Sequence, residues 1–152
     1  MTVNACRVVF SSGIARTVCL ALAAVFAAAC AVPISYYDAT TYTNLTSLKA
    51  ETTSLIETFD EKTYDKNEAK IEAASLSFLK AYEYEKGKGA PNSDTARQFE
   101  IIRKLYLGAV TDYRARGPGG LGKKFFGAAS TQLGQAFDIA IATENLKNKD
   151  KR

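Results

Sequence analysis

The chain has 152 residues, of which 47% are hydrophobic and 24% are charged, and its formal net charge is +4. A chain of this length forms one domain with a modest hydrophobic core. It contains no histidine. This absence excludes Ser–His and Cys–His catalytic pairs, the most common general base, and every metal site that needs a histidine ligand.

The first 29 residues differ from the rest of the chain. They contain no acidic residue, and their basic residues are Arg7 and Arg16. From Thr17 to Ala29 the chain carries no charge over thirteen residues. As a helix this run would be roughly 20 Å long, shorter than the roughly 30 Å hydrocarbon core of a bilayer. A basic beginning, a short apolar run and small residues at its end predict a secretory signal peptide over residues 1–29.

The end of the apolar run has a more specific pattern. The sequence Ala27-Ala28-Ala29-Cys30 resembles the lipobox of bacterial lipoprotein precursors, in which small residues precede an obligatory cysteine. The resemblance covers the first thirty residues only. It implies that the signal is removed before Cys30, whose thiol is diacylated and which becomes the acylated N-terminus. Ala27 departs from the family pattern, which usually has leucine three positions before the cysteine.

Ordinary signal processing explains the same residues in a second way. Ala27 and Ala29 also form an A-x-A site, and cleavage there by ordinary signal peptidase would release a soluble periplasmic protein. We favour lipidation because Cys30 closes the apolar run, is the only cysteine after the signal, and precedes a polar stretch. Cys6 and Cys19 lie inside the signal. The mature chain therefore holds one cysteine and no internal disulfide.

Helical periodicity predicts two helices in the first half of the mature chain. Asp38 is the expected N-cap of the first. The second opens near Asp65 and closes in the turn at residues 86–91, where glycine supplies the C-cap and proline prevents continuation. The residues of the two stripes, spaced by threes and fours, are Tyr42, Leu45, Leu48, Thr52, Leu55, Ile56 and Phe59, then Ile71, Ala74, Ser75, Phe78, Leu79 and Tyr82.

The same spacing predicts two further helices. Ser93 or Asp94 is the expected N-cap of the third, which ends at the glycine-rich residues 117–120. The fourth frays into a tail over residues 147–152. Their stripes are Phe99, Ile102, Leu105, Tyr106, Ala109, Val110 and Tyr113, then Phe126, Ala129, Leu133, Ala136, Phe137, Ala140 and Ile141.

Four amphipathic helices, and no stretch with convincing period-two alternation, predict an all-α fold. Short connections favour antiparallel neighbours, so we expect an up-down-up-down four-helix bundle over residues 38–147, after the signal peptide. Residues 30–37 would form a short tether between the lipid and the bundle, and residues 148–152 a basic tail.

The mature chain shows few signs of catalysis or cofactor binding. After Cys30 it has 18 basic and 16 acidic residues, so we expect no nucleic-acid binding. Residues 117–124 nearly match a P-loop, but Lys124 stands where that loop needs a magnesium-binding hydroxyl. A carboxylate di-metal site in a bundle needs Glu-x-x-His motifs, so we expect no metal, no cofactor and no enzyme. The glutamates are interpreted as solvated helix faces: Glu51, Glu57, Glu68, Glu72, Glu83, Glu85 and Glu100.

Two groups of residues are candidates for an interaction surface. Adjacent helix residues point about 100° apart, so Phe125 and its neighbour on the core stripe do not easily face one core. With the lysines beside it, Phe125 suggests a membrane or partner contact, unless it caps the end of the bundle. Tyrosines just after the anchor suit the headgroup level, unless they complete the core. The candidate residues are Tyr36, Tyr37, Lys123, Lys124 and Phe125.

Together these patterns lead us to expect an envelope lipoprotein, anchored to the membrane through a lipid on Cys30, whose bundle binds an envelope protein as an accessory subunit. Ala31 follows the cysteine, and the resemblance to lipoproteins implies that a residue other than aspartate there sorts the protein to the outer membrane, facing the periplasm. Three alternatives stay open: a soluble periplasmic protein, an inhibitor or immunity protein of a toxic enzyme, and an enzyme or small-ligand carrier.

Overall fold

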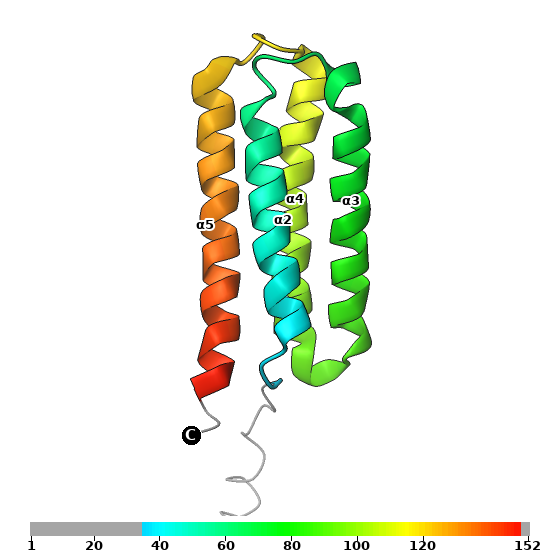
Figure 1. Ribbon diagram of the computed structural model, residues 1–152, viewed down its shortest axis with the longest axis vertical. Helices are drawn as coiled ribbons and strands as arrows, with labels where there is room; N and C mark the ends of the chain where they lie inside the picture. Colours follow the sequence, from blue (N-terminus) through cyan, green and yellow to red (C-terminus); the bar gives the residue numbers. More distant parts are fainter. Residues whose placement is uncertain (1–34, 150–152) are drawn as a thin grey trace, which may run out of the picture. The chain divides into compact units, whose positions relative to one another are not determined.

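A computed structural model describes residues 35–149 of the chain (Figure 1). These residues contain no strand and form four long helices: α2 (Ala39–Glu57), α3 (Tyr64–Gly87), α4 (Ser93–Arg116) and α5 (Gly122–Lys149). A short 3-10 helix, η1 (Ala90–Asn92), precedes α4. The predicted all-α four-helix bundle is confirmed. The predicted signal peptide, Cys30, the start of the tether and residues 150–152 lie outside the described residues.

Each helix packs mainly against its two neighbours around the bundle. Both α2 and α4 lie between α3 and α5. Successive helices run in opposite directions, as the colours in Figure 1 show. Hydrogen bonds agree with this arrangement, because Asp38 before α2 contacts Glu144 near the end of α5, and Asn67 near the start of α3 contacts Tyr113 near the end of α4.

Local sequence signals explain two of the helix ends. Asp38 is the N-cap of α2, as predicted, and its Oδ1 accepts hydrogen bonds from the backbone N–H groups of Thr40 and Thr41 at 2.7 and 3.4 Å. Gly117 ends α4 with a φ of 68°, a left-handed conformation that glycine adopts without strain. The chain can therefore reverse direction into α5.

Two other helix ends differ from the prediction. Neither Ser93 nor Asp94 caps α4, because Asn92 holds the N-cap position and its side chain donates to Glu85 instead of accepting from the helix. The tail expected to fray from Lys147 is helical at that point, and the lysine is buried. In both cases the structure has a buried polar contact that apolar periodicity does not record.

The hydrophobic core extends along the whole bundle. Almost all of the stripe residues predicted for the four helices are buried or half-buried. Leu79 is an exception, with 44% of its surface exposed. The largest apolar and aromatic side chains with almost no exposed surface are Phe59, Phe78, Phe99, Tyr106, Tyr113, Phe126 and Phe137.

Aromatic rings close the bundle at the end where α2 and α4 finish, which we call the aromatic end (Phe59, Tyr113 and Phe126). Phe59 stacks on Tyr113 with 4.1 Å between ring centroids, and Phe126 meets both rings edge-on. The Tyr113 hydroxyl donates to the Lys62 carbonyl at 2.5 Å and accepts from Asn67 at 3.1 Å. Burial raises the pKa of Tyr113, in agreement with a hydroxyl that donates inside the bundle. These contacts fasten the α2–α3 connection to the core.

The aromatic end provides a test of the packing. Replacing a fully buried phenylalanine with alanine removes its packing and leaves a cavity, so Phe59→Ala should lower the free energy of unfolding by about 3–5 kcal/mol. Phe125→Ala, on a ring that is 38% exposed beside the same cluster, should lower it by less than about 1 kcal/mol. Urea unfolding followed by circular dichroism measures both. Equal losses in the two variants would contradict this packing.

Candidate functional site

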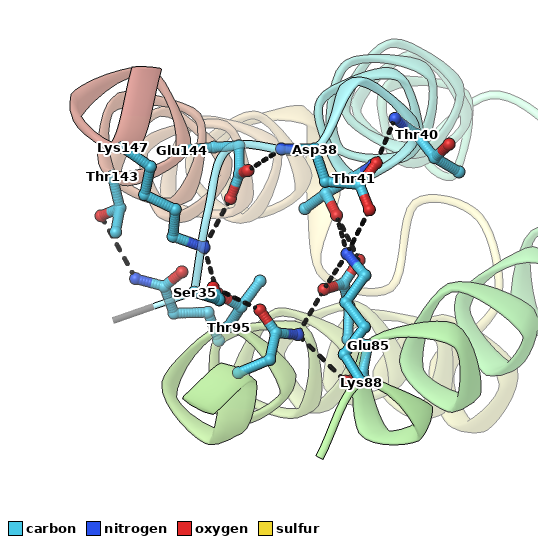
Figure 2. A network of polar contacts seen from close by, with 12 residues as sticks. Ser35, Asp38, Thr40, Thr41, Glu85, Lys88, Thr95, Thr143, Glu144 and Lys147 are labelled. Carbon is cyan, nitrogen blue, oxygen red and sulfur yellow. Dashed lines mark hydrogen bonds and ion pairs between the residues drawn. The ribbon is translucent and has the colours of Figure 1, made fainter. Parts of the chain in front are cut away.

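Polar side chains occupy the opposite end of the bundle, which we call the polar end. They come from the start of α2, the end of α3, η1, the start of α4 and the end of α5, and they include three carboxylates and two ammonium groups (Figure 2). This polar network consists of Ser35, Asp38, Thr41, Glu85, Lys88, Asn92, Thr95, Glu144 and Lys147.

Glu85 lies at the centre of one half of the network and has no exposed surface. Its Oε1 accepts from the Thr41 hydroxyl at 2.6 Å, and its Oε2 accepts from the Asn92 amide at 2.6 Å. Lys88 Nζ lies 3.0 Å from Glu85 Oε2 and 2.7 Å from Asp38 Oδ2. A buried carboxylate is tolerated only when such partners replace its lost water. The interpretation of Glu85 as part of a solvated face is therefore wrong.

The pKa of the Asp38 carboxyl reflects opposing effects. Partial burial raises it, but hydrogen bonds from Lys88, Tyr84 and the Thr40 amide, together with the charge of Lys88, lower the pKa well below its ordinary value of 3.8. The Tyr84 hydroxyl donates to Asp38 Oδ2 at 2.7 Å. Burial lowers the pKa of Lys88, yet its contacts with Asp38 and Glu85 outweigh burial and raise it. Both groups are therefore charged at neutral pH.

A second buried ion pair forms the other half of the network. Lys147 Nζ lies 2.7 Å from Glu144 Oε2, and their side chains are 7% and 1% exposed. The same ammonium donates to the Thr95 hydroxyl at 2.8 Å. Glu144 Oε1 accepts from the backbone N–H of Asp38 at 2.7 Å. The end of α5 is thus joined to the start of α4 and to the chain that enters α2.

The segment before α2 is bound to the bundle at both of its ends. The Ser35 backbone N–H donates to the Pro91 carbonyl at 3.2 Å, and the Ser35 hydroxyl donates to Asn92 Oδ1 at 2.8 Å. Asp38 contacts α3 and α5 as described above. Residues 35–37, predicted to be part of a tether, therefore lie against η1 and the helix ends, and any tether that follows Cys30 is correspondingly shorter.

The sequence analysis did not identify the buried charged residues, although a signal for them exists. Glu85 lies seven residues after the buried Phe78, and Glu144 lies seven residues after the buried Phe137. Seven residues make about two turns of an α-helix, so each glutamate lies on the same face of its helix as the buried phenylalanine. A charged residue at a position that continues the apolar face of a helix is thus the sequence signal for a buried polar contact.

The two candidate tyrosines lie at the polar end. Tyr36 is 79% exposed, whereas Tyr37 is half-buried and its ring lies 6.5 Å from the ring of Tyr42. Tyr36 therefore presents aromatic surface to solvent next to the point where the described chain begins. Tyr37 serves largely to pack the segment against α2.

The other three candidate residues lie at the aromatic end, near the start of α5. Lys123 and Lys124 are exposed, and Phe125 is partly exposed with its ring edge-on to Phe126 at 5.3 Å. Because the two groups of candidates are separated by the length of the bundle (Figure 1), they do not form a single continuous patch. The two tyrosines lie at the polar end, and the two lysines and Phe125 lie at the aromatic end.

A surface groove of about 640 Å³ lies between α3 and α4 near the polar end. Its lining includes three cations, one carboxylate and two large apolar side chains: Lys86, Arg97, Lys104, Glu100, Tyr82 and Ile101. We call it the α3–α4 groove. It is separate from the polar network, whose charged groups face one another inside the bundle.

The polar network is suited to holding the chain in place. Each of its carboxylates has an ammonium group within 3.0 Å, so none is left as an unpaired acid or base. Among residues 35–149, no three Cys, Asp or Glu side chains gather closely enough to hold a metal ion. The chemistry that this arrangement supports is fixation of the N-terminal segment on the bundle.

The Glu144–Lys147 pair allows a direct test of the buried network. Lys147→Met leaves the Glu144 carboxylate buried without its counter-ion, so we expect a loss of about 3 kcal/mol in the free energy of unfolding. Adding Glu144→Gln should restore most of it, because the amide oxygen still accepts from Asp38. Lys104→Met removes an exposed pair and should cost less than about 1 kcal/mol. Urea titrations of the four proteins would contradict a buried pair if Lys147→Met behaved like Lys104→Met.

The lowered pKa of Asp38 predicts a dependence of stability on pH. Because the folded-state pKa lies below the ordinary value of 3.8, the charged form contributes stability at neutral pH, and this contribution is lost as the pH falls below about 4. Asp38→Asn keeps a good N-cap but lacks the charge. We expect the variant to be less stable than the wild type at pH 7 and the difference to shrink in acid. A difference that is constant from pH 7 to pH 2 in urea titrations would contradict this.

Comparison with known proteins finds no family model, no curated protein and no solved structure that matches the chain significantly. Across residues 35–149, no helix combines the length and the apolar character that crossing a bilayer requires.

Proposed function

We propose that the protein is a lipid-anchored lipoprotein of the bacterial envelope and that its bundle works by binding, as an accessory subunit of an envelope complex. The observation that carries the proposal is the short distance in sequence between two features. The lipobox-like residues 27–30 end only five residues before Ser35, and Ser35 is already bound to η1.

The reach of the connecting chain relates the bundle to the proposed anchor. Five residues in extended conformation span at most about 18 Å. Acyl chains on Cys30 would therefore hold the polar end close to the membrane surface. A helix of 24 residues such as α4 is about 36 Å long, so the aromatic end would extend into the periplasm. Ala31 after the cysteine supports the outer membrane as the location, by the same resemblance to lipoproteins.

The polar network supports a role for the bundle at a defined position. A flexible tether would let the domain turn freely, whereas hydrogen bonds at Ser35 and Asp38 connect the chain from Cys30 directly to three helices. Replacing buried ion pairs with apolar residues is often neutral or stabilising. The network is thus better explained by the fixed direction in which the chain leaves the bundle than by stability.

The interior and one face of the bundle support binding rather than catalysis. Between its two ends the described core is filled by apolar rings such as Phe78, Phe99 and Phe137. Outside, Ile139 and Leu146 of α5 are 65% and 60% exposed. These two residues are seven positions apart and so lie on one face of α5, and this apolar face supports the binding of a partner there.

The anchor can be tested by the mass of the mature protein from its host's membranes. We expect a chain that begins at Cys30 and carries two or three acyl chains, which together anchor it essentially permanently. Cys30→Ala keeps the A-x-A site at Ala27 and Ala29, so the variant should be cleaved by ordinary signal peptidase and move to the soluble periplasmic fraction. Cys19→Ala, inside the predicted signal, is the matched control and should remain in the membrane.

Two results would refute the anchor. One is an unmodified N-terminus at or near Cys30 in the wild-type protein. The other is retention of the Cys30→Ala variant in the membrane fraction after a high-salt wash, which would show that something other than the lipid holds the protein there.

A further inference from the structure

The cations of the α3–α4 groove come from two helices and are mostly available to a ligand. Lys104 lies 2.8 Å from Glu100, the carboxylate of the groove. Neither Lys86 nor Arg97 forms an ion pair with any residue in the range 35–149. Lys86 Nζ lies 5.8 Å from the centre of the Tyr82 ring, a contact that leaves its charge uncompensated. The groove therefore has positive charge to offer to an anion.

The rest of the groove is apolar or small. Tyr82 and Ile101 line it together with Ala90 and Ala96, and Ile101 is 49% exposed. Two cations without an ion pair, beside an apolar wall, match a ligand that combines a phosphate with a hydrophobic part. A simple inorganic anion would use the charge but would leave the apolar wall in water.

The position of the groove favours a membrane lipid as that ligand. Ser35 is bound to the Pro91 carbonyl and to Asn92 of η1, and Ala90 of the same short helix lines the groove. The groove thus begins beside the segment that leads back to Cys30. Exposed Tyr36 and Tyr84 lie at the same end, and tyrosines are enriched at the headgroup level of membranes.

We propose that the α3–α4 groove binds the phosphate headgroup of an anionic phospholipid in the membrane that holds Cys30, through Lys86 and Arg97. The choice of a lipid rests on the proposed anchor, which brings the polar end to the membrane surface. The anionic chemistry rests on the groove alone. Binding there would hold the side of the bundle formed by α3 and α4 against the lipid surface, in addition to the covalent anchor.

The test uses residues 31–152 without a lipid, because the buried core residues of the described range 35–149 all lie between positions 45 and 140 and the fragment contains all of them. Sedimentation with vesicles of phosphatidylglycerol and phosphatidylcholine measures its affinity. Near an anionic surface each cation changes affinity about fivefold. The double variant Lys86→Gln/Arg97→Gln should therefore bind about 25-fold more weakly, while circular dichroism shows unchanged helicity.

The matched control is Lys123→Gln/Lys124→Gln, which removes two exposed lysines at the aromatic end. It should bind within about twofold of the wild-type fragment. Wild-type binding should also weaken with added salt and be absent with vesicles of phosphatidylcholine alone. Equal losses in the two double variants would indicate general charge attraction and would overturn the proposal.

Two further outcomes would also overturn the proposal. If inorganic phosphate or glycerol phosphate displaced the fragment from vesicles at concentrations too low to act as salt, the groove would be a site for a soluble phosphate. If the wild-type fragment did not bind anionic vesicles, the groove would not be a site for a phospholipid headgroup. Neither outcome affects the anchor at Cys30, which is read separately from the mass of the mature N-terminus.

Discussion

The burial of the Glu85 carboxylate is the constraint on which the polar end of the bundle depends. A carboxylate removed from water destabilises the fold by several kcal/mol unless hydrogen bonds and a counter-ion replace its hydration. Thr41, Lys88 and Asn92 provide these contacts from α2, from the end of α3 and from η1. Each of these residues must be in place before the charge is satisfied. The requirement therefore couples the start of α2 to the α3–α4 connection.

The same constraint determines the path of the chain that enters the bundle. Lys88 also pairs with Asp38, whose backbone N–H donates to Glu144, and Asn92 also accepts from Ser35. The buried polar groups of the helices therefore hold the N-terminal segment in place, and the segment in turn supplies part of the hydrogen bonds that these buried groups require. A proposed lipid at Cys30 would act on the helices through this segment without a long flexible linker between them.

The two ends of the bundle use different physical means to close. At the aromatic end, rings such as Phe59 and Phe126 exclude water by packing, with a tyrosine hydroxyl that satisfies the adjoining connection. At the polar end, buried and partly buried charged groups close the bundle by pairing with one another. The proposed anchor would hold the bundle by its polar end, and the α3–α4 groove begins at that end.

Local patterns in the sequence were sufficient to predict the four helices. Apolar residues at threes and fours, the Asp38 cap and Gly117 each act within one or two turns of the chain, so the four helices and the all-α class followed from them. The contacts that allow Glu85 and Glu144 to be buried followed only from the tertiary structure. Each glutamate has a lysine three residues away, but other partners lie 44 and 106 residues away in the chain. The sequence does not show which groups of other helices complete these hydrogen bonds, because the groups come together only in the folded bundle.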